Sequence, residues 1–207
     1  MKGRLITLEG GEGAGKSTAV ETIKQWLEAR GRRVTVTREP GGTAAAEKIR
    51  AILLDPETGE LAPTTELLLM FAARCENLAR VIRPALQAGQ DVICDRFTDA
   101  SLAYQGGGRG LGRAPVEALA ALVHPDLSPD LTLLLDIDVA AGMARTRQRG
   151  QQPDRFEQAR EGFLDRVRAS YLDQARREPE RFVVIDAGQP LAEVQHCIKQ
   201  ALEEKLQ

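Results

Sequence analysis

Short apolar runs alternate along this chain with longer segments in which apolar residues recur at helical spacing. The apolar runs have the length of β-strands and cover residues 5–8, 34–37, 92–94, 131–135 and 182–185. Strands that alternate with helices in this way form a largely parallel sheet. The pattern therefore predicts a three-layer α/β/α fold, with a five-stranded parallel sheet and helices on both of its faces.

Most of the predicted strands end in polar or charged residues. In a parallel sheet the carboxyl ends of the strands lie at one edge, and ligands bind at that edge in open α/β folds. We therefore expect the functional site close to the residues that follow four of the five strands, namely Glu9, Arg38, Glu39, Asp95, Arg96 and Asp136.

The first predicted strand leads into a glycine-rich segment that fits the pattern G-x-x-x-x-G-K-[ST]. Its glycines let successive backbone N–H groups point at one anion, at the positive end of the helix that follows. Lys16 can reach the β- and γ-phosphates of a nucleotide, and the Ser17 hydroxyl can ligate Mg²⁺. We expect a P-loop NTPase fold in which a nucleoside triphosphate contacts the whole segment, Gly10-Gly11-Glu12-Gly13-Ala14-Gly15-Lys16-Ser17.

Length, charge and cysteine content narrow the functional classes. The chain of 207 residues suits a single domain over residues 1–207, and its formal net charge of −2 gives no long-range attraction to nucleic acid or acidic membranes. Its three cysteines form no C-x-x-C pair and indicate reduced thiols. Without a predicted signal peptide or bilayer-spanning run, we expect a cytoplasmic protein with no nucleic-acid or membrane partner.

A turn is predicted after the second strand, in the segment Thr37-Arg38-Glu39-Pro40-Gly41-Gly42-Thr43. Thr43 is a good N-cap for a helix that contains Arg50 and ends near Leu54. A second, longer helix is predicted to begin at Thr64 or Thr65. Arg38 and Glu39 are either part of the site or a solvated pair in a loop, and the pattern leaves this open.

The longer helix brings Met70, Phe71 and Arg74 close together, because residues three and four positions apart are neighbours on a helix. An apolar or aromatic side chain beside a guanidinium suits a nucleobase. Phe71 could equally be a core residue. Further along, Ser101, Tyr104 and Gln105 share one helix face and could bind a base and a sugar, or be ordinary surface residues.

The third strand delivers Asp95 and Arg96 to the predicted site. Asp95 has the position of the acidic residue that assists Mg²⁺ in P-loop enzymes. Arg96 could pair with Asp95 or bind a phosphate, and we favour the phosphate because the strand end points into the site.

The helix after the fourth strand is rich in arginine near its end, with Arg145 and Arg149 on one face and Arg147 elsewhere. Gly150 to Pro153 breaks this helix, and Arg155 follows. Such a segment resembles a lid that closes over phosphates, and we place it at about residues 145–157. A solvated basic face is the alternative.

Together these segments resemble thymidylate kinase of the bacterial type, a P-loop nucleoside monophosphate kinase family. The resemblance is carried by residues 9–17, 37–43, 95–97 and 101–106, and 154–157 and 186–190 add to it. The blocks follow one another in the family's order and span most of the chain. The P-loop alone specifies only a nucleotide-binding protein, whereas Arg-Glu-Pro-Gly-Gly and Asp-Arg-Phe are much more specific.

The resemblance implies transfer of the γ-phosphoryl group of ATP to dTMP with Mg²⁺, giving dTDP and ADP for dTTP biosynthesis, and a homodimer. It implies that Ser17 and Asp95 lie at the metal and that Lys16, Arg96, Arg149 and Arg155 act in catalysis. It places the substrate against Glu39, Pro40, Arg50, Met70, Phe71, Arg74, Arg96, Ser101, Tyr104 and Gln105. The family's stacking Phe corresponds to Met70, with Phe71 one residue later, so both are candidates for covering the base.

The acceptor phosphate in such a reaction is mostly dianionic near neutrality, so it needs no strong general base. Positioning and charge compensation must then supply most of the acceleration. Two alternatives remain: a kinase for another pyrimidine nucleoside monophosphate such as dUMP, and a P-loop switch whose hydrolysis gates a partner.

Overall fold

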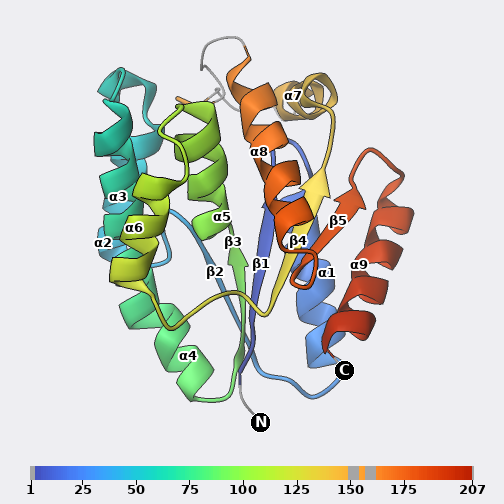
Figure 1. Ribbon diagram of the computed structural model, residues 1–207. Coiled ribbons are helices and arrows are strands. Elements are labelled where there is room, and N and C mark those ends of the chain that lie inside the picture. The colour runs from blue at the N-terminus through green and yellow to red at the C-terminus, as the bar shows by residue number, and fades with distance from the viewer. Residues whose placement is uncertain (1–2, 149–153, 157–161, 207) are drawn as a thin grey trace.

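Five parallel strands form the centre of the computed structural model, which describes residues 3–148, 154–156 and 162–206 (Figure 1). The sheet has the order β2-β3-β1-β4-β5. The strands are β1 (Leu5–Gly10), β2 (Val34–Arg38), β3 (Asp91–Asp95), β4 (Leu131–Asp136) and β5 (Phe182–Asp186). Each predicted apolar run is a strand, one or two residues longer than the apolar pattern, so the predicted five-stranded parallel sheet is confirmed.

Helices surround the sheet on both faces, as predicted (Figure 1). Short 3₁₀ and π-helical segments occur at Pro56–Thr58, Leu78–Ile82 and Leu102–Gly108. The α-helices are α1 (Lys16–Glu28), α2 (Ala44–Leu54), α3 (Pro63–Asn77), α4 (Arg83–Gln87), α5 (Thr98–Ser101), α6 (Ala114–Val123), α7 (Val139–Gln148), α8 (Phe163–Arg177) and α9 (Leu191–Leu206).

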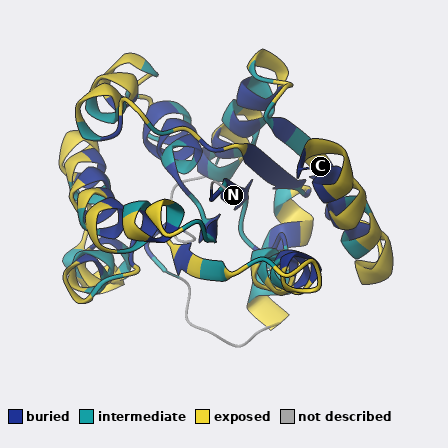
Figure 2. Cartoon of the chain, turned by 90° about the horizontal axis from the view of Figure 1, so that it is seen from below, coloured by how far each residue is buried: buried dark blue, intermediate teal, exposed yellow. Residues whose placement is uncertain are grey.

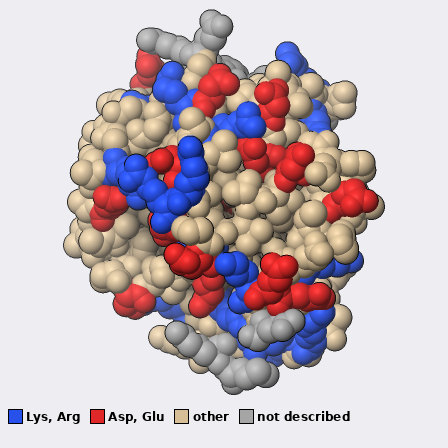
Figure 3. Space-filling model, turned by 45° about the vertical axis from the view of Figure 1, so that its right-hand side comes forward, with Lys and Arg blue, Asp and Glu red and all other residues tan. Residues whose placement is uncertain are grey.

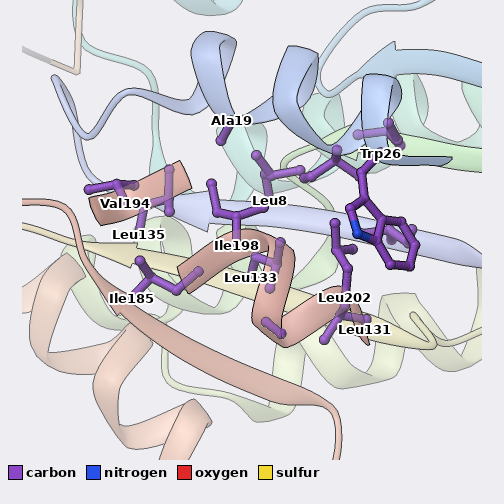
Figure 4. Close-up of a cluster of buried hydrophobic side chains, with 14 of the residues drawn as sticks. Leu8, Ala19, Trp26, Leu131, Leu133, Leu135, Ile185, Val194, Ile198 and Leu202 are labelled. Carbon is purple, nitrogen blue, oxygen red and sulfur yellow. The ribbon is translucent and has the colours of Figure 1, made fainter. Parts of the chain in front are cut away.

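The largest core cluster lies between β1, β4 and β5 and the helices α1 and α9 (Figure 4). Ile23 and Trp26 of α1 and Ile198 and Leu202 of α9 pack there against strand residues such as Leu133. Burial of such aliphatic side chains contributes about 1.5–3 kcal/mol each. Buried positions line the inside of the helices and exposed positions their outside (Figure 2), so the three layers rest on the amphipathic pattern of the sequence.

Of the two predicted helix starts, one is confirmed and one is wrong. Thr43 caps α2 as predicted, and its hydroxyl accepts a hydrogen bond from the Ala46 backbone N–H at 3.1 Å. The prediction for α3 is wrong, because this helix begins at Pro63 with Ala62 as its N-cap. Proline is well suited to the first helical turn, since it lacks an N–H that would go unpaired there.

Strand register brings the polar strand ends to one level. Asp95 lies opposite Leu8 of β1 and Arg38 of β2, and Asp136 lies opposite Asp186 of β5. The candidate functional residues therefore lie together at the carboxyl edge of the sheet.

The described part of the chain contains no helix long and apolar enough to cross a membrane.

Candidate active site

The glycine-rich segment forms a tight loop between β1 and α1. Gly13 and Gly15 have φ angles of 70° and 89°, a region that only glycine adopts readily. A side chain at Gly13 would also place its Cβ 2.1 Å from the carbonyl oxygen of Gly142, so the loop packs directly on α7. Gly15 is the N-cap of α1, and the loop lies at the positive end of this helix.

Lys16 lies across this loop. Its Nζ donates hydrogen bonds to the carbonyl oxygens of Gly10 at 3.2 Å and Gly11 at 3.0 Å. Burial, together with the positive charge of Arg96, lowers the pKa of Lys16 below its ordinary value, although Glu12 opposes this. The ammonium group is thus held beside the loop, where a phosphate would relieve its unfavourable burial.

An open cavity lies next to this loop at the carboxyl edge of the sheet, with about 600 Å³ of empty space that includes solvent outside its mouth. Nine of the ten residues that the sequence assigned to the substrate line it, and Glu12 of the P-loop is part of the same wall. These nine are Glu39, Pro40, Arg50, Met70, Arg74, Arg96, Ser101, Tyr104 and Gln105.

Phe71 is the tenth, and the structure places it behind the wall. Its ring is buried and packs with Leu67, Leu102 and Val116 in a separate core cluster. Met70 lines the cavity instead, together with Phe97 and Phe156. Phe71 supports Arg74 from behind, with the guanidinium carbon 4.4 Å from the ring centroid. Of the two candidates for covering a base, Met70 is thus the one that faces the cavity.

Arg74 is the most deeply buried cation of the cavity wall, with 2% of its surface exposed. Its Nε donates to Glu39 at 2.6 Å, and its Nη2 donates to the Phe97 carbonyl at 2.9 Å and the Ser101 hydroxyl at 3.1 Å. Its Nη1 is buried and finds no partner among the described residues. A buried donor without a partner is costly, so this nitrogen is ready for an acceptor atom of a ligand.

Glu39 is held in place at the same time. Its other carboxylate oxygen accepts a hydrogen bond from Asn77 at 3.3 Å. Burial raises the pKa of Glu39 above its ordinary value, and the adjacent guanidinium of Arg74 opposes that rise. Nearby, Arg50 donates to the Pro40 carbonyl at 2.9 Å, which directs a second cation to this side of the cavity.

Arg96 connects the cavity with the P-loop. Its Nη2 donates to Glu12 at 2.9 Å, and the Tyr104 hydroxyl donates to the same carboxylate oxygen at 2.8 Å. Burial opposes ionisation of Glu12, but Arg96 and Lys16 outweigh it, so the pKa of Glu12 lies below its ordinary value. Of the two sequence readings for Arg96, pairing with Asp95 is therefore not the one seen. The partner is Glu12, and the guanidinium faces the cavity.

The backbone at Arg96 is unusual, with φ at 69° in a region that non-glycine residues seldom adopt. Glu9 holds it there, because one carboxylate oxygen accepts the Phe97 N–H at 2.7 Å. The other oxygen lies 2.7 Å from the Tyr171 hydroxyl, which accepts a hydrogen bond from Arg96 Nη1 at 3.1 Å. Glu9 was predicted only as a strand end, and Tyr171 was not predicted, because its position in the middle of α8 gives no motif signal.

Ser17 and Asp95 line a second, more open hollow, together with Thr37 and Arg38. Asp95 Oδ1 is buried and has no hydrogen-bond partner among the described residues. Within the same residues no group of three or more His, Cys, Asp or Glu side chains could hold a metal ion. A hydroxyl and one unsatisfied carboxylate fit Mg²⁺, which takes few protein ligands when it also binds phosphates and water.

The arginine-rich segment that was predicted as a lid begins within α7, and the structure describes only part of it. Arg149 lies outside the described residues. Arg145 donates to the Ala187 carbonyl at 2.8 Å and lines a small hollow that also includes Gly15 and Gln189. This hollow adjoins the P-loop at Ala14 and Gly15 and shares no lining residue with the cavity, and it was not predicted from the sequence.

Arg155 does not lie at the position predicted for it, which is beside the transferring phosphoryl group. It is buried beside α2 and α3, where its Nε donates to the Leu53 carbonyl at 2.8 Å and its Nη2 to Glu66 at 2.5 Å. The reason is electrostatic, because Glu66 is fully buried and needs cationic partners. A catalytic role for Arg155 stays a prediction, and it requires this guanidinium to leave Glu66.

Comparisons with known proteins agree with this geometry. The family model for thymidylate kinase matches residues 8–198. A thymidylate kinase of Chromohalobacter salexigens is 57% identical over 99% of this chain and 97% of its own length, and one of Alkalilimnicola ehrlichii is 54% identical over 97% and 93%. A crystal structure of thymidylate kinase from Ehrlichia chaffeensis has a TM-score of 0.80 and 32% identity, covering 98% of this chain and 99% of that one. The chain therefore belongs to the thymidylate kinase family.

Proposed function

We infer that this member of the thymidylate kinase family transfers the γ-phosphoryl group of ATP to dTMP and so produces dTDP and ADP. The observation that carries this inference is the shared wall of two sites. Glu12 belongs to the P-loop and also lines the cavity that holds Arg74 and Gln105, next to Arg96. A donor phosphate on the loop and an acceptor phosphate in the cavity would therefore lie close together, both next to these two side chains.

We propose that the acceptor nucleotide lies in the cavity with its phosphate toward Arg96 and Arg50 and its base toward Arg74 and Gln105. The unpartnered Nη1 of Arg74 supports the base position, since thymine offers carbonyl oxygens as acceptors. Met70 and the aromatic rings of Phe97 and Phe156 supply an apolar surface for a ring. Tyr104, held by Glu12, borders the space for the sugar.

The donor is ATP, and we propose that its phosphates occupy the P-loop, with backbone N–H groups and Lys16 as their ligands. Ser17 and Asp95 would hold Mg²⁺, which when bound compensates phosphate charge and orients the donor. Arg145 and the small hollow beside Gly15 would take the remainder of the nucleotide, since a guanidinium stacks well on an aromatic base. Each of these groups acts by position and charge.

The chemistry in this arrangement is electrostatic. Arg96 can contact both the acceptor phosphate and the group in transfer, because its guanidinium lies between the cavity and the P-loop. The acceptor oxygen is already anionic near neutrality, so the chain's residues need only bring two polyanions together and hold them in line. An arginine in such a position contributes about 10³–10⁵ in rate in phosphoryl transfer.

Rates of ADP formation with a panel of monophosphates test this function. We expect kcat/KM to be highest for dTMP, lower for dUMP, and lowest for dCMP and purine monophosphates. ATP hydrolysis that proceeds at full rate without any acceptor nucleotide would contradict the kinase and favour a P-loop switch. A preference for dUMP over dTMP would support the alternative pyrimidine kinase.

We further propose that the protein is a single-domain cytoplasmic homodimer whose partners are small nucleotides. Its three cysteines are unpaired, which suits a reducing compartment. Basic and acidic side chains are interspersed over the face drawn in Figure 3, and the formal net charge is −2. Such a distribution favours small anions bound by local arginine clusters over a long polyanion.

A further inference from the structure

Glu66 is a fully buried carboxylate of α3, and its contact with Arg155 is one of several that it makes. Its Oε1 accepts a hydrogen bond from Gln105 Nε2 at 2.9 Å and one from Arg109 Nε at 3.2 Å. Its Oε2 accepts from Arg109 Nη2 at 3.1 Å and from Arg155 Nη2 at 2.5 Å. Two arginines thus balance its charge, while the neutral amide of Gln105 is the one partner among the three that also lines the cavity.

An ionised carboxylate has acceptor atoms only. Gln105 must therefore turn its NH₂ group toward Glu66, and the carbonyl oxygen is the amide atom left to receive a donor from a ligand. Gln105 itself is 1% exposed, so solvent has little opportunity to compensate a flipped amide. Glu66 thereby fixes which end of the Gln105 side chain a ligand meets.

This orientation matters for pyrimidine choice. Thymine and uracil carry a hydrogen on N3 and a carbonyl oxygen at position 4, whereas cytosine has an acceptor at N3 and an amino group at position 4. A carbonyl oxygen from Gln105 matches the N3–H of thymine, and Arg74 Nη1 matches its position-4 oxygen. Against cytosine the same pair sets acceptor against acceptor and donor against donor, which a buried site rejects strongly.

We propose that Glu66 is a specificity-determining positioning residue, which selects thymine-type over cytosine-type acceptor bases by holding the Gln105 amide in one orientation. This proposal rests on the proposed function, in that the base of the acceptor lies against Gln105 and Arg74. Glu66 touches neither substrate nor phosphate, and it influences the choice of base through Gln105.

The test is the ratio of kcat/KM for dTMP to kcat/KM for dCMP in Glu66→Gln. A glutamine offers both a donor and an acceptor, so the Gln105 amide can then take either orientation. We expect the ratio to fall about tenfold or more, since a correctly placed hydrogen bond to a base contributes discrimination of about this size. A ratio equal to that of the wild type, with both rates unchanged or lowered in proportion, would overturn the proposal.

Arg109→Gln is the matched control, because Arg109 binds the same carboxylate and does not line the cavity. It should leave the ratio within about twofold of the wild type. If Glu66→Gln fails to fold, as judged by its melting transition, the charge-balanced pair Glu66→Gln with Arg109→Gln carries the same expectation. If the ratio falls as far in Arg109→Gln as in Glu66→Gln, charge loss explains the effect and the proposal is wrong.

A second variant reverses the hydrogen bond. In Glu66→Gln combined with Gln105→Glu, the new amide donates to the new carboxylate, which again presents an acceptor to the base. Recovery of the dTMP preference supports the proposal, and a ratio as low as in Glu66→Gln contradicts it. Failure of the proposed function is a separate result, because the wild type would then phosphorylate neither dTMP nor dCMP.

Discussion

Arg96 is the residue at which conformation, charge and position meet. Its strained backbone directs the side chain across the gap between the P-loop and the cavity, and Glu12 and Tyr171 hold the guanidinium there. Local strain of this kind costs of order 1–3 kcal/mol and persists only where the surroundings enforce it. In this protein Glu9 enforces it from the end of β1.

Replacement of Arg96 by alanine should separate catalysis from donor binding. We expect Arg96→Ala to lower kcat by about 10³ or more, because the group that compensates charge on the transferring phosphoryl is lost. Affinity for a non-hydrolysable ATP analogue, measured by calorimetry, should change less than about tenfold. Arg113→Ala removes a half-buried arginine that pairs with Glu117 and does not line the cavity, and it should leave both quantities unchanged. A near-normal kcat in Arg96→Ala would remove this residue from the mechanism.

Glu9 should give the folded state a specific pH dependence. Burial, with the nearby charge of Asp99, raises the pKa of Glu9 to about 8, from an ordinary value of 4.5. The folded protein therefore binds a proton that the unfolded chain has lost between these pH values. By linkage, the contribution of Glu9 to stability is fully present below pH 4.5 and is lost as the pH rises toward 8.

Glu9→Gln removes this titration and keeps the shape of the side chain. We expect the free energy of unfolding of the wild type, minus that of the variant, to decrease steadily between pH 5 and pH 8. Urea unfolding at a series of pH values measures both quantities. A difference that stays constant, or that increases with pH, would show that the buried carboxyl is ionised throughout.

Of the contacts between elements, we expect the one between the P-loop and α7 to affect nucleotide binding most. Gly13 and Gly31 have nearly the same φ angle, 70° and 73°, but only Gly13 has a backbone atom in the path of a side chain. Gly31→Ala should therefore destabilise the protein by about 1–2 kcal/mol, the cost of the left-handed conformation alone. Gly13→Ala should destabilise it further.

Nucleotide binding distinguishes these two variants most clearly. Gly13→Ala must displace the loop or α7, so we expect it to weaken binding of an ATP analogue at least about tenfold, whereas Gly31→Ala should retain wild-type affinity. Calorimetric titration together with thermal melts provides both readouts. Equal affinities for the two variants would mean that the loop tolerates a shift away from α7.

The elements themselves were largely predictable from sequence. The strands follow from short β-branched and aliphatic runs, and the start of α2 from Thr43, because these signals are local. The order of strands in the sheet and the π-helical segment Leu102–Gly108 depend on tertiary packing. The start of α3 at Pro63 was missed because Thr64 and Thr65 give a similar local signal. The substrate residues of the cavity were predicted from the resemblance to thymidylate kinase, because local spacing alone left their roles open.

What the sequence could not supply were the supports behind the motif residues. Glu66 lies in the first turn of α3 and Tyr171 in the middle of α8, and hydrogen-bond partners of these residues are 39 and 162 positions away in the sequence. Phe71 is the aromatic residue next to the stacking position, which Met70 occupies, and the helix turns Phe71 into the core while Met70 faces the cavity. Only the packed structure contains this information.

For the molecule as a whole, we expect the proposed homodimer to form through exposed apolar side chains of α2, α3 and α6. Ile52 of α2, Leu68 of α3 and Leu122 of α6 are 47%, 52% and 77% exposed. We expect sedimentation at micromolar concentration to give twice the 22.6 kDa mass of the chain, and Leu68→Glu with Leu122→Glu to shift the mass toward one chain. A wild type that sediments as one chain at all concentrations would contradict the homodimer.

We expect two anionic nucleotides to lie together at the carboxyl edge of the sheet, one on the P-loop and one in the cavity. A crystal structure with dTMP and a non-hydrolysable ATP analogue would locate both. The dTMP phosphate should lie within hydrogen-bond distance of Arg96, and a carbonyl oxygen of thymine should lie at Arg74 Nη1. A monophosphate bound away from both arginines would contradict this expectation.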